Sequence, residues 1–351
     1  TRPPVTVTPQ SSGRSSALIG AGIFLSRLLG LLRQSLIAKY LGAGMVADAF
    51  NGAFRITNIL QNLFGEGALS ASFIPVYANA LERKQQEEAD RIAGAVAVIL
   101  ALVCAVLVAL GILAAPLVVQ AVVGGFTGEK LELTIRLTRI LFPGAGLFVM
   151  GAWCLGILNS HRRFFLSYAA PVFWNVAMIV ALVAFGPRRG EVDLAVIISW
   201  ASVIGAALSL IAQLPSVFRL LGHPRFRLDY AYPPVREAVR NFLPAFVSRG
   251  VVQLSGYVDI WLASHIPVNG VVTLLQNAQT IYLLPISLFG MSVSAAELPE
   301  MSRHAGTGAE AFERLRSRLN GALPRVAFFV VPSAIGFFVL GEAIAGVLLQ
   351  H

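Results

Sequence analysis

Long apolar runs recur along the whole sequence, and they constrain its fold more than any other feature. Each run has about 20 residues or more, the length that an α-helix needs to cross a bilayer. Of the 351 residues, 56% are hydrophobic and only 13% are charged, whereas about a quarter of a soluble domain is charged. The sequence therefore predicts an all-α integral membrane protein with about nine transmembrane helices.

Charged residues, glycine and proline separate the expected helices. By hydropathy the helices cover residues 17–41, 47–80, 91–123, 131–158, 165–186, 192–220, 240–266, 270–301 and 321–349. The polar segment before them, residues 1–16, is rich in Pro, Ser and Thr and is expected to be a disordered cytoplasmic tail. We expect an N-terminal six-helix lobe over residues 17–222, a cytoplasmic link over 223–239 and a partial C-terminal lobe over 240–351.

A short internal similarity supports two lobes of the same design. The segment 63–75 contains Leu-Phe-Gly followed by Ser-Ala-Ser-Phe-Ile-Pro, and residues 288–299 contain Leu-Phe-Gly followed by Ser-Ala-Ala-Glu-Leu-Pro. Both copies end an expected span, which fits a parallel repeat of six spans. Chance similarity among Leu, Ala and Ser in apolar helices is the alternative explanation.

Basic residues gather in alternate connections and so predict the orientation. The tail, the segment at residues 83–91 and the loop at residues 161–163 are basic, as are the links near residues 219–240 and 303–318. The opposite connections hold little beyond Lys130, Arg188 and Arg189. By the positive-inside rule we expect the N terminus to lie in the cytoplasm. The net charge of +9 is then a matter of topology, and nucleic-acid binding is not expected.

The second expected helix carries a continuous polar face. Its polar residues are three or four positions apart, so they fall within an arc of about 80°: Asp48, Asn51, Arg55, Asn58, Asn62 and Glu66. The first expected helix adds Arg27 and Arg33. A charge at mid-bilayer costs roughly 3 kcal/mol, so these side chains are expected to face water or one another. A hydrated transport cavity is one interpretation; buried ion pairs and amides that hold helices together are the other.

The choice of arginine points to an anionic ligand. A guanidinium group stays protonated and pairs with phosphate through two hydrogen bonds, so several arginines in one cavity suit a phosphate or diphosphate. The sequence has no Walker A loop and no recognisable nucleophile and base, which favours gradient-driven transport over an enzyme. Asp259, in the seventh expected helix, is a candidate for cation coupling or for a salt bridge to another helix.

Other residue types suggest little chemistry. Cys104 and Cys154 each lie in an apolar run, and the five histidines are scattered, so neither a disulfide nor a metal site is expected. No cofactor is expected beyond possible coupling to Na⁺ or H⁺. The four tryptophans are expected mostly to anchor helices in lipid or at the membrane interface.

A series of short motifs lies within the first 80 residues. They are Ser-Arg-Leu-Leu-Gly-Leu-Leu-Arg at 26–33, Gly-Ala-Gly at 42–44, Asp-Ala-Phe at 48–50, Phe-Arg-Ile-Thr-Asn at 54–58, Leu-Phe-Gly-Glu-Gly-Ala at 63–68 and Phe-Ile-Pro-Val at 73–76. In order and spacing they resemble the MurJ (MviN) family, the lipid II flippases of the multidrug/oligosaccharidyl-lipid/polysaccharide exporter superfamily. The resemblance continues more loosely through the rest of the chain.

This resemblance implies two six-helix lobes around a central cavity that binds the diphosphate-sugar head of lipid II. Arg27 and Arg33 match the cavity arginines of the family, and Asp48 matches its functional aspartate. Glu66 matches the acidic residue after the break in the second helix, and Asp259 matches an aspartate linked to cation binding in some members.

The sequence also departs from the family. Gln61 and Thr280 stand where many members have cavity arginines, Thr57 replaces the usual proline before Asn58, and family members continue beyond the last residue of this chain.

We therefore expect a flippase for undecaprenyl-diphosphate-linked peptidoglycan precursor that works by alternating access. In this hypothesis Arg27, Arg33 and Arg55 hold the diphosphate, while Asp48 and Glu66 hold or release those arginines. Asn58 and Asn62 complete the expected substrate-binding surface. The alternatives are an exporter of another polyprenyl-linked glycan or drug, and a non-transporting scaffold subunit with a membrane-complex partner.

Overall fold

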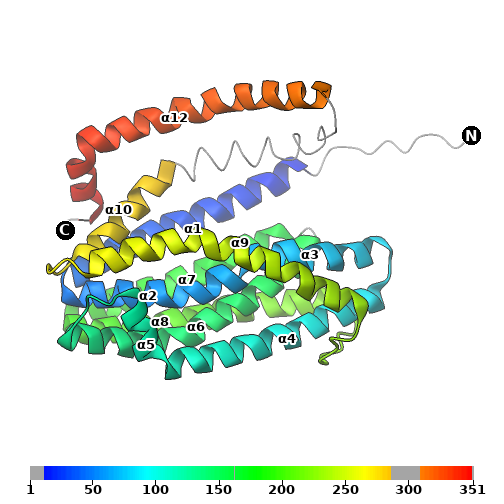
Figure 1. Cartoon of the computed structure of the whole chain (residues 1–351), viewed down its shortest axis with the longest axis horizontal. Coiled ribbons are helices and arrows are strands. Elements are labelled where there is room, and N and C mark those ends of the chain that lie inside the picture. The colour runs from blue at the N-terminus through cyan, green and yellow to red at the C-terminus, as the bar shows by residue number, and fades with distance from the viewer. Residues whose placement is uncertain (1–11, 162, 286–308, 350–351) are drawn as a thin grey trace, which may run out of the picture. The chain divides into compact units, whose positions relative to one another are not determined.

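The computed structural model of the chain describes residues 12–161, 163–285 and 309–349. Over these ranges the regular structure is entirely helical (Figure 1). The helices are α1 Ser12–Leu41, α2 Met45–Phe64, α3 Glu66–Glu82, α4 Gln86–Leu113, α5 Ala115–Val122, α6 Gly128–Ser160, α7 Phe164–Phe185, the 3₁₀ turn η1 Gly186–Arg188, α8 Glu191–Leu220, α9 Pro233–Ser264, α10 Val271–Pro285 and α12 Ala309–Leu349. The predicted all-α membrane fold is confirmed.

Several described helices are long and apolar enough to cross a membrane by themselves. They are the five helical segments Gln86–Leu113, Gly128–Ser160, Ala169–Arg188, Glu191–Leu220 and Leu319–Gly346. Helix α2 instead carries the polar face expected from the sequence. The count of about nine spans stays a prediction.

Two of the expected spans are each divided into two helices. The second span breaks at Gly65, which separates α2 from α3, and the third breaks at Ala114, which separates α4 from α5. A Cβ atom at position 65 would meet the carbonyl oxygen of Gln61, so this turn requires glycine. Pro116 lies in the first turn of α5, where a proline ring is tolerated because that N–H has no helical partner.

The N-terminal boundary differs from the expected one. Helix α1 begins at Ser12, so residues 12–16, expected to belong to a disordered tail, are helical. The last proline of that segment is Pro9, and the backbone N–H groups after it are free to form helical hydrogen bonds.

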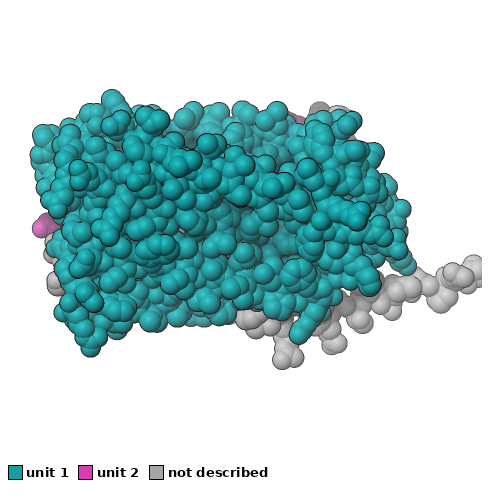
Figure 2. All heavy atoms as spheres, turned by 90° about the horizontal axis from the view of Figure 1, so that it is seen from below, with its two compact units in different colours: residues 1–272 teal, residues 273–351 magenta. Residues whose placement is uncertain are grey.

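The chain divides into two compact units, residues 1–272 and residues 273–351. Figure 2 colours the first unit teal. Helix α9 belongs to the first unit together with the six preceding expected spans. The lobe limits expected at residues 222 and 240 stay predictions, and the second copy of the internal repeat, residues 288–299, lies outside the described residues.

Within the first unit, α6 is the central helix and packs against α2, α4 and α8 (Figure 1). Helix α7 packs between α8 and α1, and α9 covers α3. Two apolar clusters hold this arrangement together. One joins α1, α2, α6, α7 and α8 around Phe50 and Leu182; the other joins α3, α4 and α6 around Phe73 and Trp153. Helix α2 packs against both α6 and α9, and its polar residues contact these two helices.

Candidate functional site

Asp48 lies near the start of α2 and is fully buried. Its Oδ2 atom is 2.6 Å from Nζ of Lys130, and it also accepts a hydrogen bond of 2.7 Å from the backbone N–H of Gly270. Lys130 lies in the first turn of α6, and Gly270 immediately precedes α10. One carboxylate therefore joins α2, α6 and the connection between α9 and α10.

Gly270 can take part in this junction only because it is glycine. Its φ is +94°, in the left-handed region, and a Cβ atom there would meet the carbonyl oxygen of Ala43. The α1–α2, α5–α6 and α9–α10 connections meet at this end of the unit and pack directly against one another.

Lys130 is itself held by several groups. Its Nζ lies 4.1 Å from the centroid of the Phe126 ring and 3.4 Å from Oδ1 of Asn269. The Lys130 side chain is 13% exposed and lines a polar cavity of about 320 Å³ together with Glu129 and Asn269. The ion pair therefore has one fully buried partner, Asp48, and one partner that solvent can reach, Lys130.

Arg33 of α1 lies on an aromatic surface of α7. Its guanidinium carbon is 4.1 Å from the centroid of the Trp174 ring, and Nη1 is 3.9 Å from Sδ of Met178. Its Nε atom is buried and has no hydrogen-bond partner. Within the described ranges Arg33 forms no ion pair with a carboxylate, and the face of the Trp174 ring favours its positive charge.

Arg55, in the middle of α2, faces α9. Its guanidinium carbon is 5.6 Å from the ring centroid of Tyr257 and lies against Gly256, while its Nε is buried without a hydrogen-bond partner. In the part of the chain that the structure describes, Arg55 also lacks a carboxylate within ion-pair distance. The two arginines thus share one arrangement, a cation on an aromatic face.

Asn62, two turns further along α2, also meets α9. Its Nδ2 donates a hydrogen bond of 3.1 Å to Oε1 of Gln253. One turn away, the guanidinium of Arg249 lies against Gly67 at the start of α3. The polar face of α2 therefore continues as a polar seam with α9 and ends beside the break at Gly65.

The remaining predicted residues lie on the same helices. Arg27 and Asn58 are half-buried on α1 and α2, and Asp259 is exposed on α9. Glu66 is the first residue of α3. The structure thus brings the residues of α2 together with α9 and α6, and it places Arg33 against α7.

Sequence reasoning missed the partners of these residues. Trp174 was expected to contact lipid, yet it is half-buried against Arg33 and donates a hydrogen bond of 2.9 Å to Oγ of Ser202. Trp153, expected to anchor in the same way, is buried and donates to the carbonyl of Ala93. Lys130 is the single cation in the connection before the fourth expected span. This position was the only sequence signal for its ion pair with Asp48.

Among the described residues, no group of three or more His, Cys, Asp and Glu side chains could hold a metal ion. Besides the Asp48 carboxylate, the site residues described above are mainly cations, amides and aromatic rings, and cations and amides are groups that can donate hydrogen bonds to an anion.

The fold is that of multi-pass membrane transporters. The chain is similar to the MATE multidrug transporter DinF-BH, with a TM-score of 0.67 and 19% identity over 95% of this chain and 73% of that one. It is also similar to an inward-facing MATE transporter of the MOP superfamily, with a TM-score of 0.65 and 18% identity over 95% of this chain and 75% of that one. At these identities the similarity shows the fold alone.

The family described as lipid II flippase MurJ matches residues 37–351, and the chain belongs to this family. It is 31% identical to the probable lipid II flippase MurJ of Rhizobium tropici over 95% of this chain and 62% of that protein, and 30% identical to the lipid II flippase MurJ of Burkholderia cenocepacia over 96% and 66%. A solved lipid II flippase MurJ in an inward closed conformation is 27% identical, with a TM-score of 0.79, over 95% of this chain and 68% of that one. The predicted resemblance is confirmed, and the chain spans about two thirds of the length of these relatives.

Proposed function

We propose that the protein moves lipid II, the undecaprenyl-diphosphate-linked peptidoglycan precursor, across the bacterial cytoplasmic membrane by alternating access. It acts as a transporter, with no bond made or broken in the substrate. Its membership of the lipid II flippase family supports the substrate, and the arginines on α1 and α2 supply the chemistry that a diphosphate requires.

The environment of Arg33 is the observation that carries this proposal. A buried cation without a carboxylate partner lowers the stability of a protein. Its presence at position 33 therefore supports a role in binding an anionic ligand. Stacking on Trp174 covers one face of the guanidinium plane, and the Nε–H group, which has no partner among the described residues, can donate to an oxyanion. Arg55 repeats the arrangement on Tyr257, so two forks are available for a diphosphate, with Arg27, Asn58 and Asn62 on the same helices.

Asp48 has a different part in this proposal from the one expected. Its partner in this structure is Lys130, so it acts on the junction of α2, α6 and the connection before α10. The positive-inside rule puts this junction on the extracytoplasmic side. Closing the junction would seal that side while the arginines load substrate from the cytoplasm, and opening it would release the headgroup.

The remaining features of the cycle are also proposals. The N terminus is cytoplasmic, the lipid tail stays in the bilayer, and the membrane potential or a Na⁺ or H⁺ gradient resets the transporter. The exposed carboxylate of Asp259 on α9 is the candidate for cation coupling, and Glu66 is the candidate for controlling the arginines.

A second candidate function is export of another polyprenyl-linked glycan or of a drug. It is favoured by Gln61 and Thr280, which replace two expected cations. Thr280 donates its hydroxyl to the carbonyl of Gln276 one turn earlier in α10, so this side chain is already committed within its own helix.

The test replaces the flippase of a MurJ-depleted bacterium with the full-length protein and measures lipid II translocation in proteoliposomes. We expect rescue by the unmodified protein and a loss of about tenfold or more in lipid II affinity for Arg33→Ala, since a charge-assisted hydrogen bond contributes about 1.5–3 kcal/mol. Arg188→Ala is the matched control, because Arg188 is exposed and bonds only to the carbonyl of its own helix end at Ala184.

Failure of the well-expressed unmodified protein to rescue, together with tighter binding of another polyprenyl-linked glycan, would establish the second candidate instead. Stable co-purification with a membrane complex in the absence of any translocation would establish the scaffold role.

A further inference from the structure

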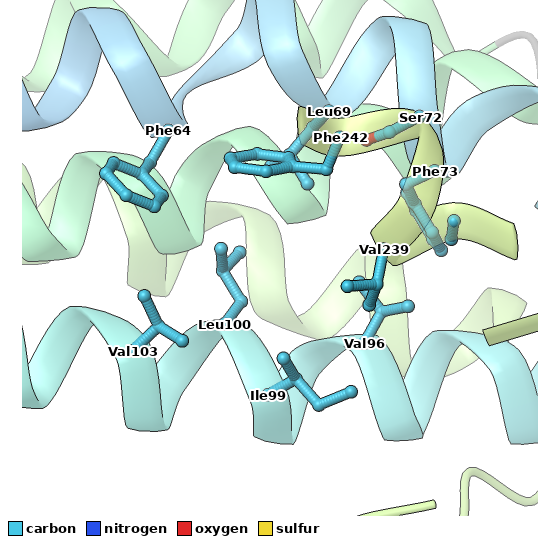
Figure 3. A pocket seen from close by; sticks show the side chains of 11 residues that line it. Phe64, Leu69, Ser72, Phe73, Val96, Ile99, Leu100, Val103, Val239 and Phe242 are labelled. Carbon is cyan, nitrogen blue, oxygen red and sulfur yellow. The ribbon is translucent and has the colours of Figure 1, made fainter. Parts of the chain in front are cut away.

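A second cavity lies away from the arginines, where α3, α4 and α9 meet. It has a volume of about 140 Å³. Figure 3 shows Val96, Leu100 and Val103 of α4 along one side and Phe64, Phe73 and Phe242 on the other. Ser72 is the one polar side chain among the residues that line it, and its hydroxyl donates to the carbonyl of Ala68. The cavity therefore offers only hydrocarbon and aromatic surface to a ligand.

The aromatic wall of this cavity is built from two segments. Phe64 of α2 lies 5.4 Å from Phe242 and 5.2 Å from Phe246, both of α9, measured between ring centroids. The rings pack at interplanar angles of 32° and 61°, tilted and edge-to-face, and so form a continuous apolar surface. A flexible hydrocarbon chain could lie along this surface without displacing any polar group.

A polar cavity of about 200 Å³ lies between the same three helices, nearer to the connection between α3 and α4. Its lining includes Asn79, Arg83 and Gln85 together with two carboxylates, those of Glu88 and Glu237. Glu88 accepts a hydrogen bond of 2.8 Å from the hydroxyl of Tyr232. Arg83 and Glu237 are exposed and form no ion pair among the described residues.

The two cavities follow one face of α4. Gln85, Glu88 and Ile92 line the polar cavity, and Val96, Leu100 and Val103 line the apolar one; these positions are three or four residues apart and so share a face. At 1.5 Å per residue each part is about 10 Å long. One leaflet has a hydrocarbon depth of about 15 Å beneath its headgroup region, so in this groove the apolar cavity can hold about the upper two thirds of an acyl chain whose headgroup lies in the polar cavity.

The charges of the polar cavity select the headgroup. One arginine suits a phosphate, and two carboxylates suit an ammonium group. A polyprenyl diphosphate would instead place its multiple negative charges beside Glu88 and Glu237, which repel it. The groove is therefore unsuited to the proposed substrate and complementary to a zwitterionic lipid.

We propose that this groove binds one aminophospholipid of the phosphatidylethanolamine type. Its phosphate lies at Arg83, its ammonium group lies at Glu237 and Glu88, and one acyl chain fills the cavity beneath Phe64 and Phe242. The basic connection at residues 83–84 puts this end on the cytoplasmic side by the positive-inside rule, so the lipid comes from the inner leaflet. Bound there, it fastens α9 to α3 and α4.

Native mass spectrometry of the full-length protein, released from mixed phosphatidylethanolamine and phosphatidylglycerol micelles, tests the site. We expect one phosphatidylethanolamine molecule to remain bound in preference to phosphatidylglycerol. Glu237→Lys should weaken its retention about fivefold to tenfold, since a single charge near the lipid headgroup contributes about 1 kcal/mol. Glu87→Lys is the matched control, because Glu87 is exposed at the same end of α4 and does not line the cavity.

A second pair of variants tests the apolar part. Val239→Trp fills the cavity from α9 and should abolish retention, whereas Val106→Trp adds the same ring to an exposed position of α4 and should leave retention unchanged. Melting temperatures measured in lipid-free detergent show whether each variant is folded. If Val239→Trp does not fold, Glu237→Lys still tests the site, because Glu237 is exposed and its substitution should not disturb folding.

Equal retention of the two phospholipids, or equal effects of Glu237→Lys and Glu87→Lys, would overturn the proposal and leave only bulk lipid at this surface. Displacement of phosphatidylethanolamine by undecaprenyl diphosphate would also overturn it, because the groove would then belong to the substrate tail. These readouts do not depend on lipid II translocation, so they are separate from the test of the proposed function.

Discussion

Lys130 and Asp48 are 82 residues apart in the sequence, and their Nζ and Oδ2 atoms lie 2.6 Å apart in the structure. This pair joins the first turn of α6 to the start of α2, and the backbone of Gly270 adds the connection before α10. A carboxylate that is fully buried depends on such partners, because burial of an unpaired charge is strongly unfavourable.

Lys130→Met should destabilise the protein by about 3 kcal/mol, since it removes the cationic partner of the fully buried Asp48 carboxylate. Thermal unfolding of the purified protein in detergent measures this change. Lys39→Met on the exposed part of α1 is the control and should have little effect. The double variant Asp48→Asn with Lys130→Met should regain part of the lost stability, because no buried charge is left unpaired. If Lys130→Met is as stable as the unmodified protein, the ion pair does not stabilise the fold.

Trp174→Leu should weaken binding of the diphosphate headgroup by about fivefold, because a cation–π contact contributes roughly 1 kcal/mol or more when it is shielded from water. Binding of a fluorescent polyprenyl diphosphate to the purified protein measures it. Trp200→Leu removes an equally large ring from an exposed position of α8 and should leave the affinity unchanged. A similar loss in both variants would mean that Trp174 acts through general packing.

Gly65→Ala should destabilise the protein by about 1 kcal/mol or more, because the added Cβ meets the carbonyl of Gln61 at the break between α2 and α3. Gly30→Ala is the control within α1, where a Cβ meets no neighbouring atom within 4 Å, and it should be neutral or stabilising by up to about 1 kcal/mol. Chemical denaturation of both variants gives the comparison, and a stable Gly65→Ala would show that the break tolerates a side chain.

Asn62→Ala and Gln253→Ala should show a coupling free energy of about 0.6 kcal/mol, the usual size for a hydrogen bond between membrane helices. A double-mutant cycle on unfolding free energies measures this coupling between α2 and α9. Additive effects of the two substitutions would place the two amides in water-filled space and contradict a direct bond.

His161 gives the protein a pH-dependent stability. It lies in the connection between α6 and α7, where its Nε2 is 3.0 Å from the hydroxyl of Tyr77. Burial lowers the pKa of His161, assisted by Arg163 and opposed by Asp90. The unfolded chain then takes up a proton at a higher pH than the folded protein does, so the stability contributed by neutral His161 is complete above about pH 6.5 and declines as the pH falls below it.

Melting temperatures between pH 8 and pH 5 should therefore decrease more steeply for the unmodified protein than for His161→Gln. His265→Gln, at an exposed position of the α9–α10 connection, is the control. Parallel pH profiles for the unmodified protein and His161→Gln would contradict this assignment.

The sequence by itself determined the membrane class, the helical fold and the polar face of α2. These properties depend on local patterns, namely the length of an apolar run and the spacing of polar residues along a helix. The expected ranges agree with the described helices to within several residues for α1, α6, α7 and α8. The motifs around Arg27, Arg33, Asp48 and Glu66 also determined the family.

Only the tertiary structure decided which groups these residues contact. Asp48 pairs with Lys130, and Asn62 bonds to Gln253, 191 residues away, while Arg33 lies on Trp174. No periodicity links such positions, because the contact depends on how separate helices cross and rotate against one another. For the same reason Trp153 and Trp174 looked like lipid anchors in the sequence: the side of a membrane helix that faces protein is set by its neighbours, and an apolar face suits lipid and protein equally well.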